Sequence, residues 1–396
     1  MATRLSRAFD DWIRKDFKAI NSELESLYFA QQARENVSDI GENLKQDLVI
    51  QGNHFVSRLL KEGNTDEGFD SGFDLLGNVG FFLAACRRHE VPGAMDRSDH
   101  SLKEASALAM HLGASLGVVP RFASAHLETH NRAINGEYKT FTSLEDEKIF
   151  LDYNVKGVFA YIRASEALLH CLPLGISHPV TKDLLEVATV ALNDVYVNNE
   201  TLFAILDVDH FFFNVRPYYK THRVGRHEYR GANAGDFAGI NVIDLLLGLC
   251  RGDDPYYSQL LVDKFLFMRP QDQLILRDCM RRKSLMDEFI QVSEQDRQSR
   301  WYQDNLRAFL AVCAAHGKTA IQHHQALVSK FIVKPANDNV LTQKQDMTAS
   351  GPPLDALITA LKKLHDLRTA ANRNDIPTRY QDVEFLRTTL TTEQTQ

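Results

Sequence analysis

The chain is poor in cysteine and has no excess of positive charge. Its five cysteines among 396 residues are widely spaced, and no two form a CxxC pair. This pattern excludes a disulfide framework and a zinc knuckle, because both need thiols that are paired or closely spaced. The formal net charge of -7 at pH 7 leaves no basic face, so we expect no nucleic-acid partner.

A long uncharged apolar run is also missing. No stretch of about 18 such residues could span a bilayer, and residues 1–17 carry charges where a signal peptide has its apolar core. We therefore expect a cytoplasmic protein without a membrane span. Strand signals are scarce, whereas apolar residues recur at helical spacing, and 44% hydrophobic residues are ample for a buried core. The predicted fold class is all-α.

Residues 306–333 form a long apolar run without proline and contain two adjacent histidines. On a helical period His324 shares a face with Leu327 and Phe331, so we expect it to point inward. His323 shares its face with His316 and is expected to point outward. A buried histidine of this kind is either a core residue held by hydrogen bonds or a metal ligand.

An arginine beside three phenylalanines marks residues 206–219. Phe211 and Phe212 precede Arg216 in this segment. A buried or half-buried guanidinium needs an anionic partner, and its fork geometry suits a carboxylate. That carboxylate belongs either to the protein or to a ligand.

A segment rich in glycine and alanine follows, and after it comes an apolar helix. Residues 231–239 carry few large side chains, which would let a flat ligand approach the backbone closely. In residues 241–249 the single carboxylate is Asp244. It either orients a histidine or pairs with a structural arginine.

Two more histidines stand four residues apart in residues 122–131, which we predict to be helical. This spacing places His126 and His130 on one helix face. They are either a metal-binding pair, a solvated pair or a single pocket histidine.

Taken in order, the segments FFFNVRPYY, GANAGDFAGINVIDLLLG, HHQALVSKFIVKPA and ASGPPLDALITALK resemble the haem-dependent superfamily of indoleamine and tryptophan 2,3-dioxygenases. The chain is most similar to the branch that holds monodechloroaminopyrrolnitrin synthase, with which it also shares patterns like NVGFFLAACRRH and VRPYYKTHRVG. The resemblance runs from about residue 60 to about residue 370. It implies a helical bundle around a haem.

The resemblance also implies roles for individual residues. His324 matches the proximal iron ligand and therefore the metal site, Asp244 a buried aspartate on the proximal side, and Arg216 the arginine that binds the substrate carboxylate. Phe211 and Phe212 match the aromatic wall of the substrate site, and Ser350 matches the position that contacts the substrate ammonium. The glycine-rich stretch near the haem matches Gly231, Ala232, Asn233, Ala234 and Gly235.

Two positions depart from the family pattern. Ile162 stands where the dioxygenases have a distal serine, and Asn233 replaces the serine of Gly-Gly-Ser-Ala-Gly. Both changes weaken the expectation of simple 2,3-ring cleavage. A distal polar group could instead come from His126 or His130.

These observations predict three regions: an N-terminal helical region at 1–60, a haem-binding catalytic domain at 61–372 and a polar, frayed tail at 373–396. The expected function is the oxidation of an aromatic amino acid, tryptophan or an indole derivative, by haem b with O2 or peroxide. Rival readings are hydroxylation of a tyrosine-like ring in secondary metabolism, a non-catalytic haem sensor or store, and a haem-free helical scaffold. Because relatives are often dimers, we also expect a possible homodimer.

Overall fold

The structure is a computed structural model that describes residues 3–63, 68–94, 102–232, 236–323 and 354–390. Five of the predicted site residues lie outside these ranges: Asn233, Ala234, Gly235, His324 and Ser350. The chain divides into two compact units. The first comprises Met1–Val155, Ile205–Asp236 and Lys330–Leu357, and the second comprises Lys156–Ala204, Phe237–Ser329 and Ile358–Gln396.

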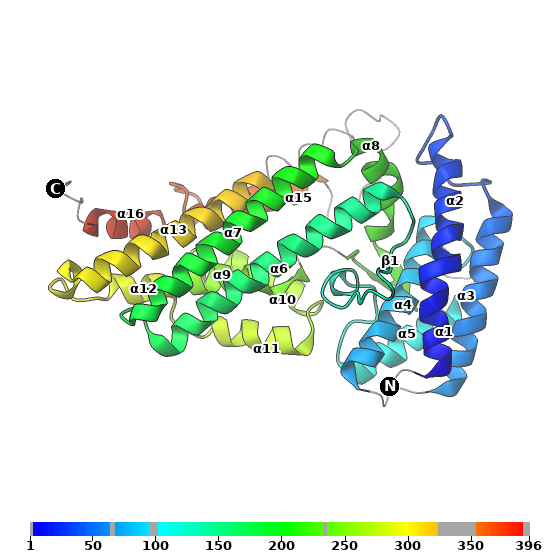
Figure 1. The fold of residues 1–396 in the computed structure, drawn as a ribbon, viewed down its shortest axis with the longest axis horizontal. Helices are drawn as coiled ribbons and strands as arrows, with labels where there is room; N and C mark the ends of the chain where they lie inside the picture. The colour runs from blue at the N-terminus through cyan, green and yellow to red at the C-terminus, as the bar shows by residue number, and fades with distance from the viewer. Residues whose placement is uncertain (1–2, 64–67, 95–101, 233–235, 324–353, 391–396) are drawn as a thin grey trace. The chain divides into compact units, whose positions relative to one another are not determined.

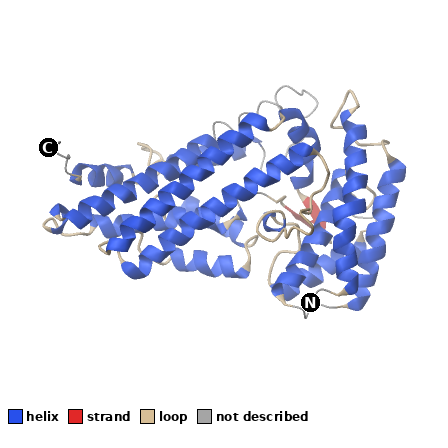
Figure 2. Ribbon diagram, in the orientation of Figure 1, coloured by secondary structure: helices blue, strands red, loops and turns tan. Residues whose placement is uncertain are grey.

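Helices dominate both units, and the prediction of an all-α fold is confirmed. Among the described residues the strands are β1 (His222–Val224) and β2 (His227–Tyr229), which pair antiparallel as a short hairpin. Figure 2 shows this hairpin as the red element among blue helices. The hairpin turns at Gly225, whose φ of 61° suits a glycine.

The first unit opens with a nearly continuous helical rod. Phe9, Trp12, Ile13 and Phe17 recur on one face of this rod and are all buried, as the apolar spacing predicts. The elements of the first unit are α1 (Arg4–Trp12), η1 (Ile13–Phe17), α2 (Lys18–Phe29), α3 (Glu42–Glu62), α4 (Phe69–Arg88), α5 (Lys103–Leu116), η2 (Ser124–His126), the start of α6 (Glu145–Leu174), α8 (Val208–His210), η3 (Phe211–Val215) and η4 (Arg216–Tyr219).

The second unit is built on long helices, of which α7 (Pro179–Ile205) and α13 (Arg300–Gln322) run side by side (Figure 1). Gln322 joins them, since its Nε2 donates to the Tyr196 carbonyl and to Glu200 Oε1, each at 2.9 Å. The other elements are the rest of α6, α9 (Ala238–Leu247), α10 (Pro255–Phe265), α11 (Pro270–Cys279), α12 (Leu285–Ile290), η6 (Asp296–Gln298), most of α15 (Leu354–Arg368) and α16 (Tyr380–Thr389).

The end of the chain differs from the sequence-based expectation. Within the region predicted as a polar tail, Tyr380–Thr389 forms α16, with Val383 and Leu386 buried in the core of the second unit. The expected fraying is therefore wrong for these residues. The two apolar side chains are three positions apart, so one helix face is enough to anchor the segment.

Candidate active site

Arg216 begins a short 3₁₀ helix directly after a π-helical turn. Proline at position 217 favours the start of η4, because its fixed φ suits the first helical turn. The Arg216 guanidinium carbon lies 5.1 Å from the centre of the Phe212 ring, a cation–π arrangement. The Phe211 ring, one residue before Phe212 in the chain, lies 5.0 Å from that of Phe150.

The half-buried Arg216 has no carboxylate partner among the described residues. Burial alone lowers the pKa of its guanidinium to about 10, with no acidic neighbour to raise it. Of the two partners considered for this arginine, a protein carboxylate is thus not seen in the described part of the chain. The guanidinium is left with an aromatic neighbour and the capacity to bind an anion.

The helix predicted at residues 122–131 is wrong. The chain forms only the short η2 there, followed by turns. At the start of η2, His126 Nδ1 accepts a hydrogen bond at 3.0 Å from the Ala123 N–H, which caps this turn. His126 and His130 instead both contact the Phe73 ring, stacked at 4.0 Å and edge-on at 5.1 Å.

His126 is 2% exposed and uses both ring nitrogens within the protein. Its Nε2 donates to the Phe73 carbonyl at 2.9 Å, and burial holds its pKa well below the ordinary value. It is therefore a neutral histidine whose two ring nitrogens are both bonded within the protein. His130 is half-buried, and its Nδ1 shares a hydrogen bond of 2.9 Å with the Thr129 hydroxyl. No group of three or more possible metal ligands occurs within the described ranges.

Gly231 has a structural reason to be glycine. A Cβ there would overlap the carbonyl oxygen of Tyr219, so the chain after β2 must pass directly against the end of η4. Ala232 beside it is 3% exposed. Asp236 closes the loop by accepting bonds from Arg121 Nη2 at 2.5 Å and from Arg230 Nη2. Gly231 thus lies against the end of η4, the element that begins with Arg216.

In the second unit the fully buried Asp244 carboxylate joins four helices. Its Oδ1 accepts from His316 Nε2 at 2.7 Å and Arg368 Nε at 2.8 Å, and its Oδ2 from Tyr257 Oη and Arg368 Nη2, both at 2.7 Å. Burial raises the pKa of this carboxyl, but Arg368 and then His316 outweigh that effect and hold it well below the ordinary value. Asp244 therefore both orients a histidine and pairs with an arginine.

His316 was not predicted as a site residue. The helix face that it shares with His323 was expected to point outward, and this is wrong at His316. It is 1% exposed, although it shares a helix face with the exposed His323. The contact with Asp244 on α9 explains the difference, because only long-range packing decides which part of a helix face is covered. His316 Nδ1 has no hydrogen-bond partner among the residues described.

A family model for monodechloroaminopyrrolnitrin synthase PrnB matches residues 3–390. The chain belongs to the PrnB family. The match begins well before residue 60, where the resemblance by motifs starts, so the opening helices are part of it. PrnB is an enzyme family of haem-dependent oxygenases, which makes this chain an oxidoreductase with a haem cofactor. Among curated proteins no match is found.

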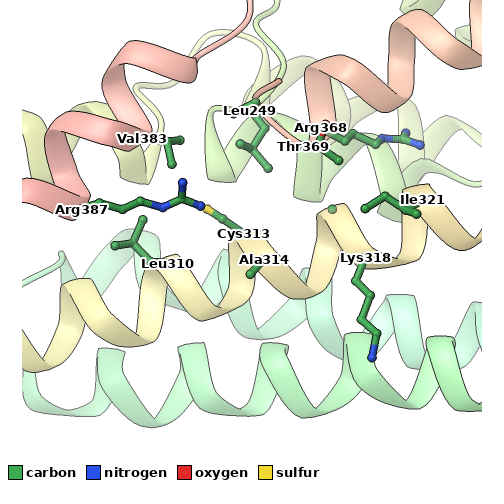
Figure 3. Close-up of a pocket in the computed structure, with 12 residues that line it drawn as sticks. Leu249, Leu310, Cys313, Ala314, Lys318, Ile321, Arg368, Thr369, Val383 and Arg387 are labelled. Carbon is green, nitrogen blue, oxygen red and sulfur yellow. The ribbon is translucent and has the colours of Figure 1, made fainter. Parts of the chain in front are cut away.

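Within this PrnB-family chain, the second unit also holds a pocket of about 220 Å³ that sequence reasoning did not find. None of the predicted site residues lines it. Cys313 and Arg387 lie together in it, and Lys318 points away toward α7 (Figure 3). Ile162, which the resemblance matches to the dioxygenases' distal serine, is half-buried in α6. In the described part of the chain no helix is long and apolar enough to cross a membrane.

Proposed function

We propose that this chain oxidises an aromatic amino acid, tryptophan or an indole derivative, with haem b and either O2 or peroxide. The observation that carries the proposal is Arg216, which stands over Phe212 without a carboxylate partner in the described ranges. A ligand carboxylate would complete the charge pair, and the aromatic ring would lie against Phe211 and Phe212.

His324 is the proposed axial ligand, as the family resemblance implies. Support comes from α13, which precedes this position in the chain and is anchored at His316, six residues before Gln322, by the bond to Asp244. The absence of any CxxC in the sequence favours haem b, because covalent attachment of haem c uses CxxCH. When bound, the haem supplies the iron that activates the oxidant.

The chain's own residues would then position the substrate. Arg216 fixes the carboxylate and the phenylalanine wall fixes the ring plane, so that the reacting carbon is held close to the oxidant. Asp244 would act on the proximal side by fixing α13, because its two oxygens already accept four hydrogen bonds. The glycine-rich residues 231–235, Ser350 as the ammonium contact and a homodimer remain predictions.

Arg216→Gln tests the substrate site. We expect tryptophan binding to the haem-loaded enzyme to weaken about 10- to 100-fold, since a charge-assisted bond contributes about 1.5–3 kcal/mol. Arg226→Gln, at an exposed position in the hairpin turn, is the matched control and should bind normally. Unchanged affinity in Arg216→Gln would contradict the proposed substrate and favour the haem sensor, for which this arginine has no role.

His324→Ala tests the axial ligand through the absorption spectrum of protein loaded with haem. The Soret band and its ligand-dependent shifts should be lost, whereas the adjacent, exposed His323→Ala should keep them. His316→Gln tests His316 as the alternative iron ligand. This variant should keep the Soret band, because His316 Nε2 is already bonded to Asp244. A spectrum that depends on His316 and not on His324 would overturn this assignment.

A further inference from the structure

Arg216 stands where two unusual helical turns meet. The π-helical turn η3 ends at Val215, and the 3₁₀ helix η4 begins at Arg216. Pro217 follows and has no N–H, so it cannot donate to the Phe213 carbonyl four residues before it, as a residue of an α-helix would. π-Helical turns are rare and are frequent at functional sites. The backbone that carries Arg216 therefore needs hydrogen-bond partners from outside the two turns.

Arg88, the last residue of α4, supplies such a donor. Its Nη2 donates to the Phe213 carbonyl at 3.0 Å. The same side chain forms a fork on the carboxylate of Glu25 in α2, with Nε to Oε1 and Nη2 to Oε2 both at 2.8 Å. Both members of this ion pair are buried. Because two parallel charge-assisted bonds fix its geometry, the pair is a rigid point of attachment for η3.

Asn214, two residues before Arg216, is bonded to the same acid. Its Nδ2 donates to Glu25 Oε2 at 2.9 Å and to the Glu25 carbonyl at 3.2 Å, and the residue is 1% exposed. Two consecutive residues of η3, Phe213 and Asn214, are thus attached to the pair of Arg88 and Glu25. One is attached through its backbone and the other through its side chain.

A second set of contacts holds η4 after Arg216. The Tyr218 hydroxyl lies 3.4 Å from His89 Nε2, and the Tyr218 ring packs edge-on against the His89 ring at 5.8 Å. His89 is fixed in turn by two residues of α2, because its Nδ1 lies 3.0 Å from Tyr28 Oη and its Nε2 lies 2.8 Å from Asn21 Oδ1. The chain is therefore held by buried contacts both before and after Arg216.

We propose that Asn214 and Arg88, joined by Glu25, are positioning residues that direct the Arg216 guanidinium toward the substrate carboxylate and so determine the preference for a ligand with a carboxylate. The inference rests on the proposed function, in which Arg216 binds that carboxylate. Asn214 and Arg88 act through η3 and not by contact with the substrate. Such an effect can be large, since a displacement of about 1 Å in a positioned group can cost about 100-fold in rate.

Two variants weaken the attachment of η3 without leaving a buried charge alone. Asn214→Leu removes both bonds from Nδ2 and keeps the ion pair. Arg88→Lys keeps a positive charge beside Glu25 but loses the fork, and with it the bond to the Phe213 carbonyl.

Two ligands isolate the carboxylate. Tryptophan and tryptamine share the ring and the ammonium group, and only tryptophan has the carboxylate. Their dissociation constants would be measured by calorimetry on the haem-loaded enzyme. We expect Asn214→Leu and Arg88→Lys each to weaken tryptophan binding about 3- to 10-fold, less than the loss of Arg216 itself, and to leave tryptamine binding unchanged.

A matched control separates positioning from stability. Asn131 is also a buried asparagine of the first unit, and its side chain bonds the carbonyl and the N–H of Lys139 at 2.8 and 2.9 Å. Asn131→Leu should lower the melting temperature and leave the ratio of the two dissociation constants unchanged. If it shifts this ratio as much as Asn214→Leu does, the effect is one of stability and the inference is overturned.

A double variant shows whether Asn214 acts through Arg216. Added to Arg216→Gln, Asn214→Leu should not weaken tryptophan binding further, because the group that it positions is already gone. A full additional loss would mean that Asn214 acts independently and would overturn the inference. If Arg216→Gln itself leaves the ratio of the two dissociation constants unchanged, the proposed function fails. If Arg216→Gln shifts this ratio but Asn214→Leu and Arg88→Lys do not, the inference alone fails.

Discussion

Replacing Asp244 by asparagine should strongly destabilise the second unit. Asp244 from α9 is fully buried, and its carboxylate accepts bonds from His316 on α13, Tyr257 on α10 and Arg368 on α15. Asparagine preserves the shape, but it removes the charge and turns one acceptor into a donor that faces other donors. Removing one member of a buried ion pair costs about 3–5 kcal/mol, because the remaining charge is left without compensation.

Thermal unfolding would measure this effect. For a unit of this size, 1 kcal/mol shifts the melting temperature by about 2–4 °C, so Asp244→Asn should lower it by about 6–20 °C. Asp253→Asn is the matched control. Asp253 also receives a two-bond fork from an arginine, Arg251, at 2.8 and 2.6 Å, but this pair is on the surface. The control should lose less than about 1 kcal/mol.

The pH dependence gives a second test of the same reasoning. Because the pKa of Asp244 is lower in the folded protein than the ordinary value of about 3.9, its contribution is present above that pH. It is lost as the pH falls below about 4 and the unfolded chain takes up the proton. The gap in unfolding free energy between wild type and Asp244→Asn should be constant from about pH 5 to 8 and shrink below pH 4. Equal destabilisation in Asp253→Asn, or a gap that does not depend on acid, would refute this account.

Two further predictions concern the first unit and α6. Gly231→Ala should lower the unfolding free energy by about 1–3 kcal/mol, because the new Cβ would overlap the Tyr219 carbonyl. Gly157→Ala should raise it by up to about 1 kcal/mol, because this glycine lies in a helix and nothing is within 4 Å of the new Cβ. Urea unfolding of both variants measures the two effects.

The sequence predicts well those helices whose spacing of apolar residues shows directly which side chains are buried. The apolar stripe of the opening helices is buried, and residues 241–247 of the nearly uncharged run lie in the buried helix α9. The prediction for the His126 segment failed because His126 is held by contacts with Phe73, 53 residues earlier in the chain, which helical periodicity does not encode. His316 was assigned to the outer face because the carboxylate that covers it lies 72 residues earlier in the chain.

The role of Arg216 could not be decided from the sequence for the same reason. Arg88 donates two hydrogen bonds of 2.8 Å to Glu25, which is 63 residues away in the sequence. Arg121 pairs with Asp236, which is 115 residues away. No local sequence pattern predicts either ion pair.

Those two arginines show that buried guanidinium groups in the first unit can be paired with carboxylates. Arg88 and Arg121 are 7% and 1% exposed, and each is paired with a carboxylate, as the cost of an uncompensated buried charge requires. Arg216 has only the Phe212 ring as a counterpart in the described ranges, and its lowered pKa reflects that lack. An anion that pairs with Arg216 would give it what Glu25 and Asp236 give Arg88 and Arg121. The missing carboxylate is therefore better assigned to a ligand, and the ligand must carry an aromatic ring to use the surface beside it.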